Sequence, residues 1–465
     1  MFRTVRTSSF LSVRASPGSV GRHSVWFQLA LATVLLCGTN SRGQTLTIEP
    51  ASTLVDHPVV IRAGGLTPGE AVSIRSELED AAGHTWRADA QFIADETGSL
   101  DLSKSPALKG SYRGVSAMGL VWAMRSNGEA HIYQAPHNLG SQNIHFTLHS
   151  KTGDATAQLE QRSLDNGVHM VQVNGLLHGV LFLPSESIPM PAGEVSDGTS
   201  ASAKRPALLV VGGSEGGTPV RRAAWLANHG YVTLALAYFH APGLPDQLRD
   251  IPLEYFGSAL HWLADRHEVD PERIGVVGAS RGGELALELG SLYPILHAVV
   301  AFVPADVRVP ACCDGGGGAA WTWHGRPLAY AGVQGYGKSP DLPAEIAVEN
   351  TRGPILMISG KDDGVWPSSQ MTARIESRLK EAHFRYEVER LDYPKAGHRA
   401  GAPEIAPAWT GALRHPVSGQ PEELGGTPDG NANSGLDAAP RILAFLARSF
   451  STKVPDTAAA TVPSR

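Results

Sequence analysis

Hydrophobic and polar positions follow two different patterns along the chain. Between about residues 46 and 148 the apolar residues form short alternating runs, such as AVSIRSEL and WRADAQFIA, separated by turn-forming pairs such as Thr97-Gly98. Strands with this spacing and these turns are typical of an antiparallel sandwich. We therefore predict an immunoglobulin-like β-sandwich over residues 44–150, followed by connecting strands and a polar linker over residues 151–205.

From about Pro206 onward, fully apolar runs alternate with amphipathic stretches. Strands that are buried on both faces and interleaved with helices indicate a mainly parallel sheet covered by helices. We predict such an α/β domain over residues 206–452 and a disordered tail over residues 453–465. The predicted strands lie near 207–213, 231–238, 273–278, 297–303, 354–360 and 386–391. The predicted helices lie near 219–229, 253–265, 281–290, 368–381 and 439–449.

The first 43 residues differ from both regions, because they contain five arginines and no acidic residue. An apolar stretch of about 13 residues, from Val25 to Cys37, follows the basic segment. That length fits the apolar part of a secretion signal and is too short for a relaxed membrane span. We expect residues 1–43 to be a removed export leader, which leaves a periplasmic or secreted mature chain without a membrane span. A membrane anchor, a mitochondrial transit peptide and a lipoprotein attachment at Cys37 are the alternatives, and bulky Leu36 disfavours the last.

Composition and charge exclude several classes of protein. With 42% hydrophobic and 18% charged residues, the chain has the composition of an ordinary globular protein. The formal net charge of −6 gives no electrostatic footprint for nucleic acid. Cys37, Cys312 and Cys313 form no CxxC pair, so neither a disulfide framework nor a metal site is expected, and no cofactor is expected either. The adjacent Cys312 and Cys313 could be free thiols or a vicinal disulfide.

The motif G-x-S-x-G occurs at Gly278–Gly282, where a predicted strand meets a predicted helix. A nucleophile elbow needs such a strand-to-helix turn, in which glycines allow close backbone packing and the serine hydroxyl projects above the sheet. The helix start also offers N–H groups to an oxyanion. We therefore expect Ser280 to be a nucleophile, which needs a base and an orienting acid from elsewhere in the chain.

In a sheet of this kind the acid and the histidine follow the serine in that order. Asp362 and Asp363 follow the predicted strand at 354–360, and His398 lies in a Gly-containing loop after the last predicted strand. We expect His398 to be the base. We prefer Asp363 to Asp362 as the acid, because Asp363 lies three residues after Gly360 and four before Pro367.

The loop Gly212–Gly217 follows the first strand of the α/β domain and lacks the residues of a phosphate-binding loop. It lies where a second oxyanion donor is expected. We therefore predict an oxyanion hole made by the backbone N–H of Arg281 and the backbone N–H of Ser214 or Glu215. Glu284, in the first turn of the helix after Ser280, is expected to stabilise the helix start rather than to react.

The aromatic segment 309–332 is where we expect substrate selection to take place. Trp321, Trp323 and Tyr330 are predicted to line an acyl or aromatic pocket. Packing of a cap against the core is an equally good explanation for the same three residues.

At these motifs the chain resembles the acyl-CoA thioesterase and bile acid-CoA:amino acid N-acyltransferase family, particularly its bacterial members. The resemblance covers nearly everything after the leader and is carried by LTPGE, GSYRGV (110–115), MGLVWAM (118–124), GYVTLALAYF, DPERIGVVGASRGGELAL, ISGKDDGVWPSSQM, YPKAGH and GGTPDGNA. It implies an immunoglobulin-like domain followed by an α/β-hydrolase domain whose nucleophile, acid and histidine fall on Ser280, Asp363 and His398.

The resemblance also separates two activities by nucleophile. The amino-acid-conjugating members of the family use cysteine, whereas its thioester hydrolases commonly use serine. Ser280 therefore favours hydrolysis of an acyl thioester, a small-molecule substrate, through an acyl-serine intermediate. A secreted carboxylesterase or dienelactone-hydrolase-like enzyme is the main alternative, because acyl-CoA is scarce where an export leader would place the protein. An N-acyltransferase and a non-catalytic binding protein are weaker alternatives.

Overall fold

The computed structural model describes residues 43–126, 131–191, 204–313, 315, 317–331, 344–408 and 412–451. The predicted leader, apart from Gly43, the predicted tail and linker residues 192–203 lie outside the described residues. None of the helices within the described residues is both long and apolar enough to span a membrane.

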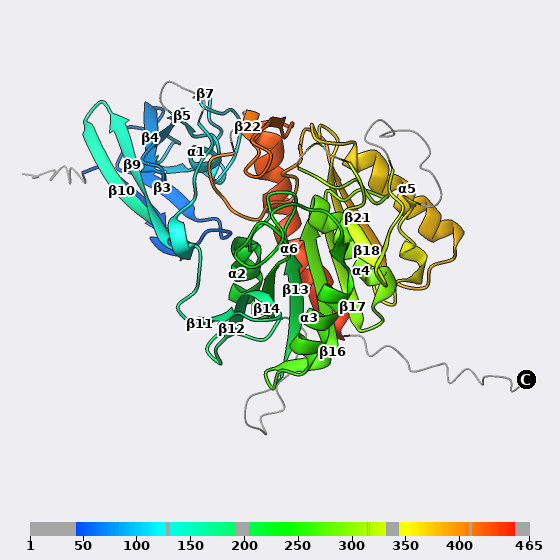
Figure 1. The fold of residues 1–465 in the computed structure, drawn as a ribbon. Helices are drawn as coiled ribbons and strands as arrows, with labels where there is room; N and C mark the ends of the chain where they lie inside the picture. The colour runs from blue at the N-terminus through cyan, green and yellow to red at the C-terminus, as the bar shows by residue number, and fades with distance from the viewer. Residues whose placement is uncertain are drawn as a thin grey trace, which may run out of the picture. The chain divides into compact units, whose positions relative to one another are not determined.

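The N-terminal part is a sandwich of two sheets (Figure 1). The smaller sheet has the order β1 (Thr45–Glu49), β3 (Val60–Gly64) and β6 (Leu100–Asp101). The larger sheet has the order β2 (Ser52–Leu54), β10 (Gly153–Arg162), β9 (Ser141–Ser150), β4 (Ala71–Glu79), β5 (Thr85–Ile93) and β7 (Lys109–Gly110), and β8 (Arg125–Ser126) also pairs with β5. The short helices α1 (Gly119–Trp122) and η1 (His137–Leu139) lie in the connections.

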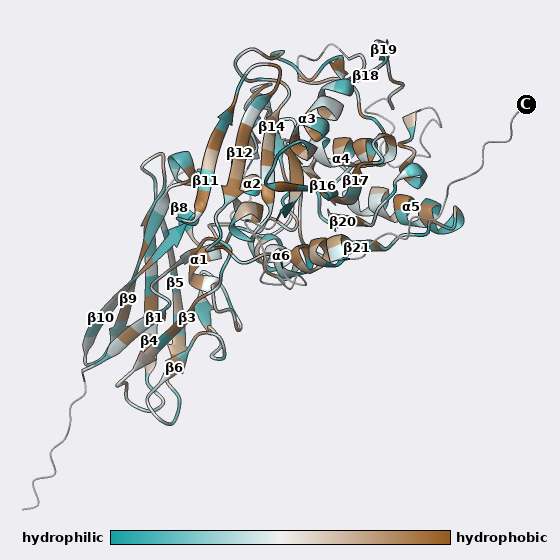
Figure 2. Ribbon diagram, turned by 90° about the horizontal axis from the view of Figure 1, so that it is seen from below, coloured by the Kyte–Doolittle hydropathy of each residue, from teal (hydrophilic) through white to brown (hydrophobic). Residues whose placement is uncertain are grey.

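Alternation of apolar and polar residues explains why these segments form a sandwich. In β4 and β5 every second residue is buried, as expected for strands with one face against a core. Trp86, Phe92 and Phe146 are fully buried between the sheets. Figure 2 shows the result as a mixture of brown and teal along the sandwich strands.

The sandwich extends beyond the predicted boundary at residue 150. Strand β10 pairs antiparallel with β9 along its whole length, from Gly153 opposite Ser150 to Arg162 opposite Ser141. The next two strands, β11 (Val168–Val173) and β12 (His178–Pro184), instead join the sheet of the α/β domain. The segment 151–205 is therefore divided between the two sheets, because pairing rather than sequence position decides where each strand belongs.

The α/β domain is built on an eight-stranded sheet within the described residues. Its first pairings, β11 with β12 and β12 with β14, are antiparallel, and the other pairings are parallel. The strand order is β11, β12, β14 (Val232–Ala237), β13 (Arg205–Val211), β16 (Val269–Ala279), β17 (Leu296–Phe302), β20 (Ile355–Gly360) and β21 (Val388–Tyr393).

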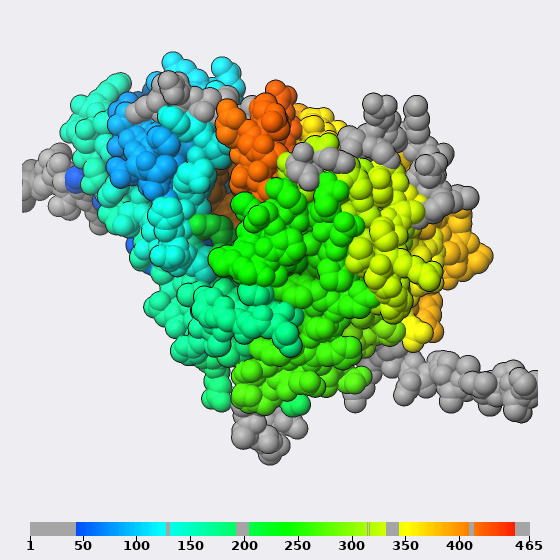
Figure 3. Space-filling view, in the orientation of Figure 1, coloured from blue at the N-terminus to red at the C-terminus, as the bar shows by residue number. Residues whose placement is uncertain are grey.

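Helices cover both faces of this sheet. The residues of β13 and β14 are all buried, as expected for a sheet with two covered faces. One core contains α3 (Glu254–Ala264), α4 (Arg281–Leu292) and α5 (Ser368–Glu381), and the other contains α2 (Val220–Asn228) and α6 (Pro428–Ser451). In Figure 3 the green and yellow side chains form a continuous surface over the strands drawn in Figure 1. Short elements complete the domain: β15 (Ile251–Pro252), β18 (Trp321–Trp323), β19 (Arg326–Pro327), η4 (Val348–Asn350), β22 (Ala412–Arg414) and β23 (Pro421–Glu423).

The predicted strands and helices of this domain all occur, but the last helix is longer than expected. It was predicted to begin near residue 439 and begins at Pro428. Its first part, PDGNANSG, has weak helix propensity, and Pro440 lies inside the helix. Tertiary contacts explain the extension, because a Cβ at Gly430 would lie 2.1 Å from the carbonyl oxygen of Lys395, and one at Gly435 would lie 2.0 Å from that of Ala402.

Asp56 connects the sandwich to the α/β domain. Its carboxylate is hydrogen-bonded to His57, to His229 at 2.7 Å and to the indole N–H of Trp225 at 3.0 Å. Burial raises the pKa of Asp56, but the hydrogen bonds from the two histidines outweigh it and hold the pKa well below its ordinary value. This carboxylate therefore stays ionised and joins the start of the sandwich to α2.

Candidate active site

Ser280 occupies a strained turn between β16 and α4. Its backbone has φ 57° and ψ −122°, a conformation that residues with a side chain rarely adopt. The N–H of Ser280 donates to the carbonyl oxygen of Phe302 in the neighbouring strand at 2.9 Å, which holds the turn against the sheet. The serine side chain is thereby held at the carboxyl end of the parallel strands, where sites of such sheets lie.

The two glycines of the motif are required by close backbone packing. A Cβ at Gly278 would lie 1.9 Å from the carbonyl oxygen of Gly282. A Cβ at Gly282 would lie 2.3 Å from the carbonyl oxygen of Gly212 and 2.7 Å from that of Val211. The turn therefore packs directly against the end of β13, and no larger residue fits without moving backbone.

Ser280, His398 and Asp363 form a chain of hydrogen bonds. The Nε2 atom of His398 lies 2.8 Å from Oγ of Ser280, and its Nδ1 atom lies 2.9 and 3.0 Å from the two carboxylate oxygens of Asp363. Oδ1 of Asp363 also accepts the N–H groups of Val365 at 3.0 Å and Trp366 at 3.3 Å. Both side chains are shielded from solvent, since Asp363 is 1% and His398 9% exposed. The structure thus brings together the three residues predicted from the sequence.

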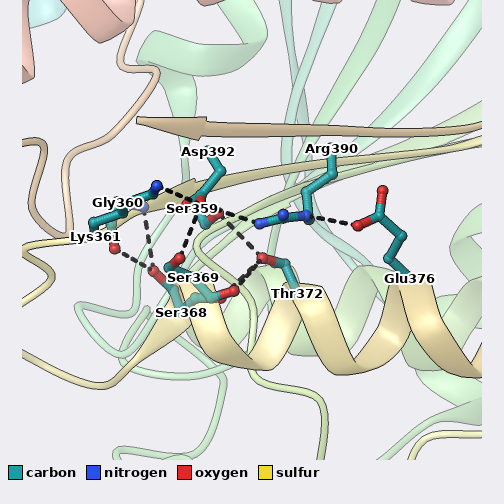
Figure 4. A network of polar contacts seen from close by, with 9 residues as sticks. All are labelled: Ser359, Gly360, Lys361, Ser368, Ser369, Thr372, Glu376, Arg390 and Asp392. Atoms are coloured by element: carbon teal, nitrogen blue, oxygen red, sulfur yellow. Dashed lines mark hydrogen bonds and ion pairs between the residues drawn. The ribbon is translucent and has the colours of Figure 1, made fainter. Parts of the chain in front are cut away.

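The acid turn, residues 361–367 between β20 and α5, is fixed at both ends (Figure 4). Gly360 precedes the turn and Ser368 follows it, and the hydroxyl of Ser368 lies 3.4 Å from the backbone N and O of Gly360. One residue earlier, the hydroxyl of Ser359 donates to Asp392 in β21 at 2.9 Å. Further members of this network are Lys361, Ser369, Thr372, Glu376 and Arg390. These contacts join β20, α5 and β21, so the turn is held in one position.

Asp362 is placed differently from Asp363. Its side chain is exposed, whereas its backbone N–H donates to Ala396 and its carbonyl accepts the N–H of Gly426, both at 3.0 Å. Asp362 therefore joins the acid turn to the loop of the histidine through its backbone.

The loop that carries His398 is held by the start of α6 and the residues before it. The N–H of His398 donates to the carbonyl oxygen of Leu424 at 2.6 Å. The side-chain oxygen of Asn431 accepts the N–H of Gly397 at 2.8 Å. Sequence analysis did not identify Asn431, because nothing in its local sequence shows that it contacts a loop more than 30 positions earlier.

Trp366 is a second residue that sequence analysis missed. Its ring lies edge-on to the imidazole of His398, with 5.0 Å between ring centroids and 84° between planes. Its indole N–H donates to the carbonyl oxygen of Val303 at 3.0 Å. Its position three residues after Asp363 is the only local sequence feature that could have suggested this role.

The loop Gly212–Gly217 passes directly against Ser280. A Cβ at Gly213 would lie 3.1 Å from Cβ of Ser280. The hydroxyl of Ser214 lies 2.9 Å from Nε2 of His415, whose Nδ1 accepts two backbone N–H groups, so Nε2 carries the proton and donates to Ser214. The loop that was predicted to supply the second oxyanion donor therefore lies next to Ser280.

Arg281 and Glu284, which follow Ser280 in the first turn of α4, form a buried pair. Nε of Arg281 lies 2.8 Å from the carboxylate of Glu284, and the guanidinium donates to the carbonyl oxygens of Val309 and Pro310. Burial raises the pKa of Glu284 above its ordinary value, while the charge of Arg281 opposes this. As the first residue of α4, Arg281 has an N–H with no acceptor in a preceding helical turn, so it is free to act as a donor.

The three predicted substrate-binding aromatic residues lie in different surroundings. Trp321 is 1% exposed, packs in the core of the α/β domain and donates its indole N–H to Glu284 at 2.7 Å. Trp323 is half-buried against Tyr293, and Tyr330 is 40% exposed. The burial of Trp321 fits the packing alternative, and a binding role for Trp323 or Tyr330 stays a prediction.

Cys312 and Cys313 form a vicinal disulfide, one of the two states that the sequence left open. Sγ of Cys313 lies 3.9 Å from the carbonyl oxygen of Ser214, so the disulfide packs against the loop Gly212–Gly217. Elsewhere, Asp56, His57 and His229 have potential metal-ligand atoms within 4.8 Å of one another. Both carboxylate oxygens of this cluster already accept hydrogen bonds from its histidines.

The fold and the hydrogen-bonded Ser–His–Asp chain together define an α/β hydrolase, preceded here by a β-sandwich, as predicted. The chain belongs to the acyl-CoA thioester hydrolase/BAAT family. The family's N-terminal region matches residues 56–175, and its C-terminal region matches residues 251–311 and 327–452. The family resemblance is thereby confirmed, and the protein is a hydrolase of thioesters or esters.

Curated relatives match over most of their length. Acyl-coenzyme A thioesterase 6 of Mus musculus is 30% identical over 442 residues, which cover 88% of this chain and 98% of the relative. The mitochondrial acyl-coenzyme A thioesterase 2 of Rattus norvegicus is 31% identical over 481 residues, covering 96% and 99%. Among solved structures, a dienelactone hydrolase from Klebsiella pneumoniae matches with 18% identity and a TM-score of 0.39, covering 60% of this chain and 98% of that one.

Proposed function

We propose that the protein hydrolyses acyl-CoA thioesters through an acyl-Ser280 intermediate, with His398 as general base and Asp363 as the residue that orients it. The observation that carries this proposal is the 2.8 Å contact between Oγ of Ser280 and Nε2 of His398, whose Nδ1 is bound to Asp363. This arrangement has the geometry that activates a serine hydroxyl at neutral pH.

In the first half of the cycle, Oγ of Ser280 attacks the thioester carbonyl as Nε2 of His398 takes its proton. The tetrahedral oxyanion is stabilised by the backbone N–H of Arg281 and by that of Ser214 or Glu215. Collapse of this intermediate breaks the bond between carbon and sulfur, and the imidazolium of His398 returns the proton to the leaving thiolate. The products of this half are the acyl-serine and a free thiol.

In the second half, His398 takes a proton from water as the water attacks the acyl-serine. The oxyester breaks, the carboxylic acid leaves, and Ser280 regains its proton from His398. Asp363 keeps the Nδ1–H tautomer in place throughout and stabilises the imidazolium that forms in each half. The acyl-coenzyme A thioesterases among the relatives support a thioester of CoA as the substrate.

A hydrolysis panel with purified protein tests this proposal. It compares acyl-CoA thioesters of several chain lengths with aryl oxyesters, and Ser280→Ala is the control. We expect release of free thiol from acyl-CoA that is lost in Ser280→Ala, together with labelling of the folded wild-type protein by a fluorophosphonate probe. If the enzyme hydrolyses oxyesters but no acyl-CoA, it is an esterase that uses the same three residues. Absence of labelling would contradict the role of Ser280.

We also propose that residues 1–43 direct export, on the basis of their basic segment, apolar stretch and lack of acidic residues. N-terminal sequencing of the protein from fractionated cells tests this. A mature chain that begins near residue 44 in the exported fraction supports it, and an intact Met1 in the cytoplasmic fraction contradicts it.

A further inference from the structure

A cavity of about 380 Å³ lies directly beside the histidine of the active site. Part of its lining is the segment Thr218–Arg222, which leads into and begins α2, and another part is His398 with the segment that follows it. Ala279, the residue before the nucleophile, and Phe302, at the end of β17, also line it. The cavity is therefore adjacent to the reacting residues, and its volume lies in the range that holds a small-molecule ligand.

Arg222 is the least satisfied cation on this cavity. Its guanidinium lies 4.8 Å from the centroid of the Phe302 ring, and its Nε atom is buried without a hydrogen-bond partner among the described residues. Burial lowers the pKa of Arg222, in keeping with a charge that has lost much of its hydration. A guanidinium whose Nε is buried without an acceptor is costly, so an anion bound in the cavity would stabilise Arg222.

Other charged groups surround Arg222: the charges of Glu404 and Glu215 raise its pKa, and that of Arg399 lowers it. Arg221 and Arg399 line the same cavity, as do the carboxylates of Glu215 and Glu404. Glu215 is engaged elsewhere, because its carboxylate accepts the N–H of Gly213 at 3.0 Å. Within the described part of the chain, no ion pair joins either glutamate to these arginines. Three guanidinium groups against two carboxylates leave the cavity lining positive.

The start of α2 adds to this positive charge. Pro219 precedes the helix, no side chain caps its first N–H groups, and its first turn contains no acidic residue. Arg221 and Arg222 are instead the second and third residues of the helix. An acidic residue would normally stabilise a helix at this end, so the placement of two arginines there costs stability in the empty protein. A helix start of this kind is suited to binding phosphate.

The position of the cavity indicates which part of the substrate it receives. Under the proposed function, His398 gives its proton to the leaving atom, so the wall formed by His398 and the residues after it faces the leaving group. A second cavity, of about 390 Å³, shares Arg221, Arg399 and Glu404 with the first and continues to Tyr133 of the sandwich. Together the two cavities provide room for a long leaving group.

We propose that Arg222, with Arg221 and Arg399, binds the phosphate groups of a phosphorylated leaving group such as that of CoA. The proposal rests on the thioesterase function, since it assigns the two cavities to the leaving thiol and leaves the acyl group to another part of the site. Arg222 provides the bidentate donors that suit a phosphate, and the start of α2 provides N–H groups beside it. The residues of the sandwich at the second cavity then help to bind the substrate.

The test measures binding as well as turnover, so that it does not depend on thioesterase activity. Calorimetry compares the affinities of free CoA, dephospho-CoA and pantetheine for the wild-type protein, for Arg222→Met and for Arg222→Lys. Arg352→Gln, which removes an exposed arginine outside both cavities, is the control. We expect wild-type protein to bind CoA more tightly than pantetheine and Arg222→Met to lose about ten- to a hundredfold in CoA affinity. Arg222→Lys should restore part of it.

Turnover of two thioesters with the same acyl group gives a second readout. The ratio of kcat/KM for the CoA thioester to that for the N-acetylcysteamine thioester should fall by about the same factor in Arg222→Met. Hydrolysis of an aryl ester shows whether Ser280, His398 and Asp363 still act together. If wild-type protein binds CoA no better than pantetheine, the proposal is wrong whether or not acyl-CoA is hydrolysed. If CoA binds as proposed but acyl-CoA is not hydrolysed, the proposed function is wrong and the phosphate site stands.

A terminal carboxylate on the acyl group is the other anion that Arg222 could bind. Glutaryl-CoA and pentanoyl-CoA have acyl groups of equal length and differ in this charge. If the wild-type protein prefers glutaryl-CoA, and Arg222→Met loses that preference while its affinity for free CoA is unchanged, the arginine binds the acyl group and our assignment to the leaving group is wrong.

Discussion

Ser280 lies in a turn formed by five consecutive residues, whereas His398 lies in a loop held in place by the start of the last helix. A Cβ on either motif glycine would collide with backbone oxygens, so the turn around Ser280 depends on its own sequence and on the end of β13. The histidine loop instead donates backbone hydrogen bonds to the carbonyl oxygen of Leu424 and to the side-chain oxygen of Asn431. The two residues of the Ser280–His398 hydrogen bond therefore differ in how far along the chain their supports lie.

This difference predicts two kinds of sensitivity to mutation. Changes in the Ser280 turn should disturb folding, because backbone packing is involved. Changes in the supports of His398 should reduce turnover first, because they shift a side chain that must lie within hydrogen-bond distance of Ser280.

The largest effect on activity is expected for Asp363→Asn. The amide keeps the shape of the carboxylate but cannot hold the Nδ1–H tautomer of His398, and substitutions of this kind lower kcat by about 10⁴-fold. The initial rate of substrate hydrolysis and the rate of fluorophosphonate labelling measure this loss of activity. A loss of this size would show that the acid turn and the histidine loop act as one unit, separate from the turn around Ser280.

Asp362→Asn is the matched control for this variant. Asp362 is the neighbouring acid, and its side chain is exposed. Activity within about twofold of wild type is expected, as for most surface substitutions. Loss of activity in Asp362→Asn with activity retained in Asp363→Asn would reverse the assignment of the acid.

A large effect on stability is expected for Gly282→Ala. Alanine normally stabilises a helix by about 1 kcal/mol relative to glycine. Here its Cβ would lie 2.3 Å from the carbonyl oxygen of Gly212, so we expect a net loss of about 3 kcal/mol, at the upper end for overpacking. Urea unfolding measures the change, and Gln370→Ala, at an exposed position of α5, is the control, which should change stability by no more than about 0.5 kcal/mol. A gain in stability would contradict the packing argument.

The Ser280 turn and the histidine loop also differ in how well they could be predicted from the sequence. The strands and helices of the α/β domain follow from hydrophobic periodicity, and Ser280 follows from a five-residue motif at a strand–helix junction. Asp363 and His398 follow from their order after predicted strands. Asn431 could not be predicted, because its segment has weak helix propensity and becomes helical through packing against the histidine loop.

The sandwich gives a parallel lesson. Alternating residues predicted its strands, but its last strand, β10, was placed outside it, because a period of two does not show which partner a strand will pair with. The segment after His398 also contacts the sandwich, since the N–H of Ile405 donates to Val55 at 2.8 Å. Contacts between regions distant in sequence are the part of the structure that local pattern does not determine.

A moderate effect is expected for Asn431→Ala. The substitution leaves the buried N–H of Gly397 without its acceptor, which costs about 1–3 kcal/mol. We expect kcat to fall about tenfold with little change in KM, because the loop that positions His398 loosens while the binding surfaces are unchanged.

Asn431→Asp is the matched variant, since its carboxylate can accept the same N–H and lies near the start of α6, where negative charge is favourable. It should recover most of kcat at a temperature well below unfolding. Equal kcat in wild type and Asn431→Ala would show that the histidine loop is held without α6.

The smallest effect is expected for Trp366→Phe. Phenylalanine keeps an aromatic ring beside the imidazole of His398 but loses the indole N–H that donates to Val303, at a cost of about 1 kcal/mol. Activity should fall only about threefold, whereas Trp366→Ala, which removes the ring as well, should lose about tenfold or more. The pair separates the anchoring hydrogen bond from the ring contact. A larger loss in the phenylalanine variant than in Asn431→Ala would mean that the acid turn, rather than α6, is the main support of the histidine.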